Sequence, residues 1–94
     1  YSNYCASKSA LRSVTLSLAI ELAPDVRVNG IAPGAIMFPD WMDEGERKDV
    51  LTKVPLGREG TPEEIAETAI FLANGPSYIT GQIIAVDGGW SLSD

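Results

Sequence analysis

The chain has 94 residues, of which 45% are hydrophobic, and its mass of 10.0 kDa fits one small domain or a piece of a larger one. A net charge of −6 disfavours nucleic acid and anionic membranes as partners, and no apolar run approaches the roughly 18 residues that a membrane span requires. The lack of histidine and the single Cys5 leave a metal site almost without ligands and exclude an internal disulfide, which suits a cytoplasmic protein.

Residues 3–23 predict a helix, because they contain no interior glycine or proline and are followed by the sequence APD. Apolar side chains occupy most of its circumference: a leucine-rich stripe of Leu11, Val14, Leu18 and Leu22, a small-residue stripe of Ala6, Ala10, Ser13 and Ser17, and Leu16 with Ile20 nearly opposite the leucines. We therefore expect a helix that is buried on most sides, which requires more cover than the rest of this chain can easily supply.

A buried strand is predicted for residues 26–36, with the sequence VRVNGIAPGAI, and Pro33-Gly34 is expected to end it. The dipeptide Asn29-Gly30 is typical of hairpin turns. A hairpin is excluded here because too few residues lie between this dipeptide and APG to form a second strand. Residues 37–60 predict a long irregular segment with a short helix over 43–53.

The last part of the chain predicts a helix over residues 61–75, which Thr61 caps, and a second buried strand over residues 82–89. Strand, helix and strand together indicate a parallel βαβ unit and therefore an α/β fold. A two-stranded parallel sheet is not stable alone, so we expect further polypeptide or a partner to complete it.

Tyr4 and Lys8 lie four residues apart, on one face of the first predicted helix. A nearby ammonium group lowers the pKa of a phenol, and proton exchange near neutral pH requires a shift of roughly three units from the usual value of about 10. One lysine produces such a shift only in a cleft that partly excludes water. Tyr1 is a rival phenol, but Cys5 lies four residues after it. The pattern alone fits either a solvated surface pair or a catalytic pair.

Four segments, YCASKSAL, LAPDVRVNGIAPGAI, TPEEIAETAIFLAN and ITGQIIAVDGG, resemble the carboxyl-terminal part of classical short-chain dehydrogenases/reductases in order and spacing. The resemblance covers essentially all of residues 1–94. It implies that this chain is the carboxyl-terminal segment of one Rossmann-type domain with a doubly wound parallel sheet. It further implies NAD(P)(H)-dependent hydride transfer to a small-molecule substrate and a homotetramer.

The resemblance also implies roles for individual residues. Tyr4 would be the general acid/base, and Lys8 would bind the nicotinamide ribose hydroxyls and lower the pKa of Tyr4. Pro33 and Gly34 would pass close to the nicotinamide, and the main chain of Ile36 would bond to its carboxamide. The small-residue stripe would pack against the same helix of a neighbouring subunit.

The sequences PGAIMFPDWMDE and GQIIAVDGGWSL look most like the pteridine reductase branch, which implies hydride transfer from NADPH to a pterin. Phe38 occupies a position where many members have threonine, so the contact of that hydroxyl with the cofactor must be lost or replaced. Phe38 and Trp41 are candidate walls of a pterin pocket, because a pterin is a flat heteroaromatic. They could equally only attach the loop to the core.

Two other readings stay open: a carbonyl or 3-oxoacyl-thioester reductase of the same family, and an inactive fragment that retains only assembly surfaces. NAD(H) is not excluded as the coenzyme. The family's glycine-rich TGxxxGxG turn and its catalytic serine would lie before Tyr1, so we expect these 94 residues alone to be inactive.

Two further segments carry weaker signals. Asp87-Gly88-Gly89 predicts a tight turn after the last strand rather than a metal loop, and Trp90 is a candidate interface anchor. The charged residues at positions 43–49 predict a solvated helix face, with a mobile lid as the alternative.

Overall fold

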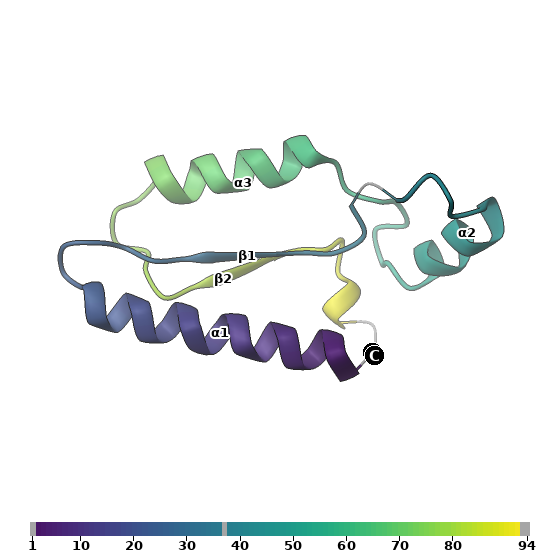
Figure 1. Ribbon diagram of the computed structural model, residues 1–94. Helices are drawn as coiled ribbons and strands as arrows, with labels where there is room; N and C mark the ends of the chain where they lie inside the picture. Colours follow the sequence, from purple (N-terminus) through teal and green to yellow (C-terminus); the bar gives the residue numbers. More distant parts are fainter. Residues whose placement is uncertain (1, 37, 93–94) are drawn as a thin grey trace.

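The computed structural model describes residues 2–36 and 38–92, and among these it describes only the backbone of residues 2–5. Its elements follow the predicted order (Figure 1). They are α1 (Ser2–Leu22), β1 (Gly30–Pro33), α2 (Glu44–Thr52), α3 (Pro62–Asn74), β2 (Ile83–Val86) and the short 3₁₀ helix η1 (Trp90–Leu92).

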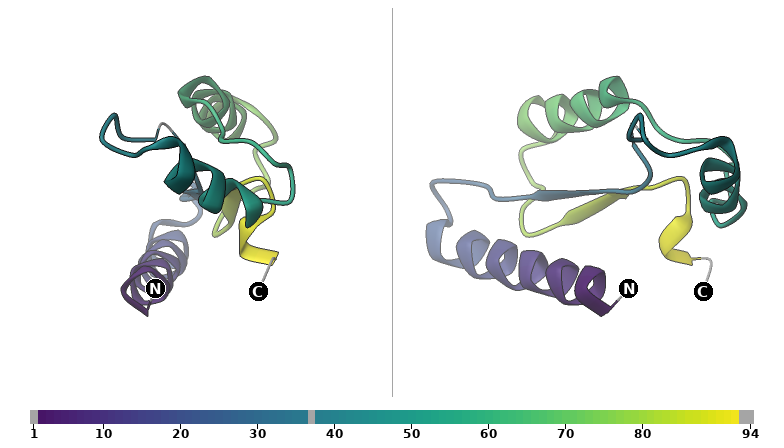
Figure 2. Two further views of the ribbon diagram at one scale, coloured as in Figure 1. Left: turned by 90° about the vertical axis from the view of Figure 1, so that its right-hand side faces the viewer. Right: turned by 45° about the vertical axis from the view of Figure 1, so that its right-hand side comes forward.

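The two strands form a parallel sheet in which Gly30 lies opposite Ile83 and Pro33 lies opposite Val86. α1 and α3 cover opposite faces of this sheet, whereas α2 lies beyond the carboxyl ends of the strands (Figures 1 and 2). This arrangement of helix, sheet and helix layers confirms the predicted α/β class. The parallel pairing also confirms that Asn29-Gly30 is no hairpin turn.

β1 begins later than the sequence predicts, because the residues before it bond to residues 80–82 ahead of β2, both through side chains and through the Val28 carbonyl, which accepts the Gly81 N–H at 2.7 Å. The Val28 N–H donates to Thr80 Oγ1 at 3.1 Å, and the Asn29 carboxamide oxygen accepts the N–H of Gln82 at 3.0 Å. These bonds satisfy the backbone without a regular ladder. The predicted strand over 26–36 is therefore too long, and its pairing with β2 is confined to Gly30–Pro33.

The face of α1 that packs on the sheet is not the leucine-rich stripe. It consists of Thr15 and Ala19, which are only 4% and 5% exposed, whereas every residue of the leucine-rich stripe is about 40% exposed or more. Gly30 and Gly81 lie opposite this face of α1: a Cβ atom on Gly30 would lie 3.4 Å from Thr15 Oγ1, and one on Gly81 would lie 3.5 Å from Ala19 Cβ, both at ordinary contact distance. In the described part of the chain, no helix is long and apolar enough to cross a membrane.

The core of this chain is thin. Its buried apolar side chains in the described residues are Ala19, Ala32, Val54 and Leu72. The accessible surface is 6792 Å², whereas a compact protein of this mass exposes roughly 5,200 Å². The radius of gyration is 15.2 Å, against roughly 12 Å for a compact domain of this length. The small-residue stripe of α1 is also exposed. Much of the apolar surface of this fold is therefore left uncovered by the chain itself.

α3 begins at a complete capping box. The Thr61 hydroxyl accepts the N–H of Glu64, and the Glu64 carboxylate accepts the N–H of Thr61. The same carboxylate receives two bonds from the Arg58 guanidinium, at 3.0 and 2.8 Å. The bonds from Arg58 are the main reason that the pKa of Glu64 falls to about 2. The loop before α3 is thus tied to the first turn of that helix.

We expect Glu64→Gln to lower the stability of the fold at neutral pH and to lose this effect in acid. Because the pKa of folded Glu64 is lowered from 4.5 to about 2, its ionised form stabilises the fold above pH 4.5, and this stabilisation disappears as the pH falls towards 2. Urea midpoints of the wild type and the variant between pH 7 and pH 3, each measured in a protein whose further strands complete the sheet, give the difference. Glu67→Gln removes the same charge from an exposed position of the same helix and is the control. An equal pH dependence of the midpoint in both variants would contradict the assignment.

Candidate active site

Three segments meet at the carboxyl edge of the sheet: the amino-terminal half of α1, the turn after β1 and the turn after β2. The strands are parallel, so both turns leave the sheet at the same edge. α1 runs back along the sheet, and its beginning (purple) lies on the same side of the molecule as η1 (yellow) in Figure 1. Ligand sites of open α/β sheets lie at this edge.

Lys8 is half-buried on α1 and contributes to a hollow of about 470 Å³ between this helix and the sheet. The lining residues of this hollow are Lys8, Ser9, Arg12, Ala32, Ile83 and Ala85. Tyr4 lies one helical turn before Lys8, which confirms that both residues are on one helix. The phenol of Tyr4 is outside the described side chains, so its distance from the ammonium group of Lys8 stays a prediction.

Asp87 forms the tight turn that the sequence predicts. Its carboxylate accepts the N–H of Gly89 at 2.9 Å and the N–H of Ser91 at 3.1 Å. Gly88 and Gly89 have φ values of 62° and 92°, which side-chain-bearing residues rarely adopt. Burial raises the pKa of Asp87, but these bonds and the charge of nearby Lys8 together lower it further, so the net shift is downward. An anionic carboxylate thus lies near the predicted catalytic cation.

Gly34 is the point at which the two turns touch. Its N–H donates to the Val86 carbonyl at 3.0 Å. A Cβ atom on Gly34 would lie 2.6 Å from Asp87 Cβ and 2.7 Å from Asp87 Cα, where no atom fits. The family resemblance implies that Gly34 passes close to the nicotinamide, which stays a prediction; the structure shows that Gly34 lies against Asp87.

We expect Gly34→Ala to destabilise the fold by about 1–3 kcal/mol, because the new methyl group must displace backbone rather than a flexible side chain. A urea denaturation midpoint measures this change. Gly30→Ala, in the same sheet, is the matched control, since its Cβ would meet only side-chain atoms at 3.4 Å. Equal midpoints for the two variants would contradict the close contact.

The residues that follow Gly34 are held by the loop before α3. The Gly60 N–H donates to the Ala35 carbonyl at 2.8 Å, and Ile36 pairs with Gly60 in an isolated parallel bridge. Ala35 and Ile36 line a second hollow of about 390 Å³, together with Asp87. The main chain of Ile36, predicted to bind the carboxamide, is therefore fixed at the same edge of the sheet as Lys8.

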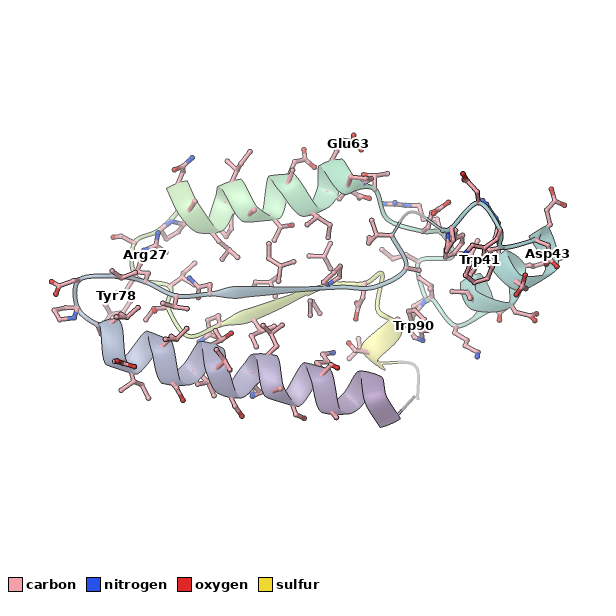
Figure 3. All side chains as sticks on the ribbon, in the orientation of Figure 1. Arg27, Trp41, Asp43, Glu63, Tyr78 and Trp90 are labelled. Atoms are coloured by element: carbon pink, nitrogen blue, oxygen red, sulfur yellow. The ribbon has the colours of Figure 1, made fainter. Side chains whose placement is uncertain are left out.

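Phe38 and Trp41 lie on the side of α2 rather than in the hollow that Lys8 lines. Phe38 is half-buried, and the Arg47 guanidinium carbon lies 5.8 Å from the centre of its ring. Phe38 contributes to a third hollow, of about 340 Å³, which Arg47 and Glu59 also line. Trp41 is 74% exposed, beside the start of α2 (Figure 3). The Phe38 side chain is therefore held by its contact with Arg47, whereas the Trp41 side chain projects from the loop.

Comparisons with known proteins agree on one family. The family described as Enoyl-(Acyl carrier protein) reductase matches residues 1–91. The 3-oxoacyl-[acyl-carrier-protein] reductase FabG of Thermotoga maritima is 46% identical over 91 residues, which are 93% of this chain and 37% of that protein. A short chain dehydrogenase from Bacillus anthracis has a solved structure with a TM-score of 0.78 and 42% identity, covering 92% of this chain and 36% of that one.

The chain belongs to the short-chain dehydrogenase/reductase family. Its relatives include more than one kind of reductase, since Pteridine reductase 1 of Leishmania tarentolae is 44% identical over 99% of this chain and 33% of that protein. The chain spans about a third of the length of the relatives it matches. Membership of this family of oxidoreductases confirms the predicted Rossmann-type class, with the chain as its carboxyl-terminal part.

Several residues at or near the carboxyl edge of the sheet could not be recognised from the sequence as parts of the candidate site. Arg47 lies in a charged run predicted to be a solvated helix face, yet it is half-buried and contacts Phe38. Glu59 accepts the Phe38 N–H across 21 residues of chain. Asp87 is predicted as a turn residue, but its proximity to Lys8 is not. Two capping boxes, Asp43 with Glu46 and Thr61 with Glu64, are local signals in this region, and they locate only the starts of α2 and α3.

Proposed function

We propose that this chain is the catalytic carboxyl-terminal part of an NADP(H)-dependent short-chain reductase, with Tyr4 as the proton donor. The observation that carries the proposal is the position of Lys8, half-buried against the sheet and near Asp87 at the edge where ligands of such sheets bind. A surface pair would have its cation in open solvent. The position of Lys8 favours the catalytic interpretation of the Tyr4–Lys8 spacing.

The residues at this edge fit the nicotinamide end of a dinucleotide. Bound NADP(H) would supply the hydride. Lys8 offers an ammonium group for ribose hydroxyls and for stabilising the anion of Tyr4. Pro33, Gly34 and Ile36 would form the wall beside the nicotinamide, with the Ile36 main chain towards its carboxamide. Tyr4 would donate its proton to the atom next to the one that receives hydride.

The pyrophosphate end has no counterpart in this chain, which contains no TGxxxGxG sequence. Within residues 2–36 and 38–92 the sheet has two strands, and each has an unpaired edge. We propose that a glycine-rich nucleotide-binding half completes the sheet and that the complete protein is a cytoplasmic homotetramer. We call this chain, when such a half precedes it, the complete reductase. The 94 residues alone should neither bind NADPH nor turn over a substrate.

A pterin is the substrate that we propose first. The reasons are the similarity to Pteridine reductase 1 and the presence of Phe38 and Trp41 on the loop after the Pro33-Gly34 turn. Aromatic side chains on a loop that closes over a flat heteroaromatic ring would stack on it. A 3-oxoacyl thioester is the second candidate, because the FabG proteins are similar to this chain at 46% identity.

Steady-state assays of the complete reductase with NADPH test this proposal. A dihydropterin and acetoacetyl thioesters are compared at equal enzyme concentration, and NADH replaces NADPH in a parallel series. Turnover of the dihydropterin supports the first candidate, and turnover of only the thioester replaces it with the second. An absence of NADPH binding by calorimetry would overturn the enzyme assignment and favour an inactive segment that only assembles with partners.

A further inference from the structure

We infer that Glu59 is a positioning residue that holds the loop after Gly34 against the loop before α3 and thereby sets the shape of the substrate pocket. This inference rests on the proposed reductase function. It assigns the role to a side chain that lies 21 residues from its partner in the sequence and has no local motif.

The central contact is a hydrogen bond between the Phe38 N–H and Glu59 Oε2, with a length of 3.1 Å. Both residues are half-buried, so the bond is partly shielded from water. A hydrogen bond to an ionised carboxylate is stronger than one between neutral groups. Glu59 therefore fixes the backbone at Phe38, the start of the loop over residues 38–43 that carries Phe38 and Trp41 (the aromatic loop), directly after the segment proposed to contact nicotinamide.

The loop that carries Glu59 is itself anchored. Arg58 donates two bonds to Glu64 in the first turn of α3, and the Gly60 N–H donates to the Ala35 carbonyl at 2.8 Å. Three consecutive residues thus each make a contact outside their own loop. α3 packs on the sheet. The bond between Phe38 and Glu59 therefore fixes the position of Phe38 relative to α3 and the sheet.

Arg47 holds the other side of the same loop. Its guanidinium lies over the Phe38 ring, its Nε donates to the Met42 carbonyl at 3.1 Å, and one terminal nitrogen donates to the Pro39 carbonyl at 3.3 Å. α2 and the aromatic loop therefore form one unit, and Glu59 links this unit to the loop before α3. Loss of the Glu59 bond should free the loop without unfolding α2.

The test uses Glu59→Ala and Glu59→Gln in the complete reductase. Alanine removes the acceptor, whereas the glutamine Oε1 atom can still accept the Phe38 N–H. Glu63→Ala is the matched control, because Glu63 lines the same hollow and its removal changes the charge equally. Figure 3 shows Glu63 at the start of α3, on the side away from the sheet.

We expect Glu59→Ala to raise KM for the substrate about tenfold, with kcat within about threefold of the wild type. Glu59→Gln and Glu63→Ala should stay within about threefold of the wild type in both constants. An unchanged KM in Glu59→Ala overturns the inference, and so does an equal loss in Glu63→Ala, which would indicate a general effect of charge.

Hydrogen exchange of a peptide spanning residues 35–42 gives a readout that does not depend on activity. Glu59→Ala should increase exchange at the Phe38 amide about tenfold or more, whereas Glu59→Gln should keep its protection. If exchange changes as expected but the wild type reduces no substrate, the proposed function fails and the structural role of Glu59 stands. Equal exchange in all variants overturns the role of Glu59 even in an active enzyme.

Discussion

Tyr4→Phe should lower kcat of the complete reductase by about two to four orders of magnitude, with the fold intact. The substitution removes one oxygen atom and keeps the aromatic ring, so the size and helix propensity of the residue hardly change. The proton that Tyr4 donates would then have to come from water, which is a weaker and poorly positioned acid. Single-turnover measurements of NADPH oxidation determine the rate of the chemical step in both proteins.

Tyr78→Phe is the matched control for this experiment. Tyr78 is fully exposed and lies at the opposite end of the sheet from Trp90 (Figure 3). Its replacement should leave kcat unchanged. A loss of less than about fivefold in Tyr4→Phe, with the same far-ultraviolet circular dichroism as the wild type, would show that another group donates the proton.

Lys8→Met should lower kcat at pH 7 by about one to three orders of magnitude and move the alkaline limb of the pH–rate profile upward. Tyr4 acts as an acid, so activity falls when the pH rises through its pKa. Removal of the cation raises that pKa towards the ordinary value of about 10, and the fall in activity moves to higher pH. The higher pKa also makes Tyr4 a weaker donor, which lowers the plateau.

The profile of kcat between pH 6 and pH 10.5 tests this prediction. Lys8→Arg keeps the charge and should retain part of the shift in pKa, whereas Lys48→Met removes a charge from the exposed side of α2 and should change nothing. A Lys8→Met profile that loses amplitude without moving along the pH axis would show that Lys8 acts only in cofactor binding. The presence of Asp87 near Lys8 makes this comparison informative, because the carboxylate opposes the effect of the cation.

The local elements of the fold could be predicted because their causes lie within a few residues. Thr61 and Glu64 satisfy the first N–H groups of α3, and Asp87 with two glycines forms a turn by its own side-chain bonds. The pair at Tyr4 and Lys8 follows from the helical repeat alone. In each case the two residues that form the pair lie only a few positions apart in the sequence.

The orientation of α1 could not be predicted in the same way. Its hydrophobic pattern predicts a helix that is buried on most sides and does not single out the face that packs on the sheet, which consists of Thr15 and Ala19. Gly30 and Gly81 lie opposite these two residues, on segments that are far from α1 in the sequence. Helical periodicity identifies the apolar faces of a helix, but it does not tell which of these faces packs on the sheet.

The sequence by itself determined the order of the elements, the parallel α/β class, the family and the register of Tyr4 with Lys8, since each depends on spacing along the chain. Tertiary structure decided that Lys8 lies near Asp87, that Gly34 contacts the backbone of Asp87, and that Glu59 holds Phe38. These contacts join residues that are 21 or more positions apart. Their partners are selected by how the sheet and helices pack, and no short-range preference of either residue specifies them.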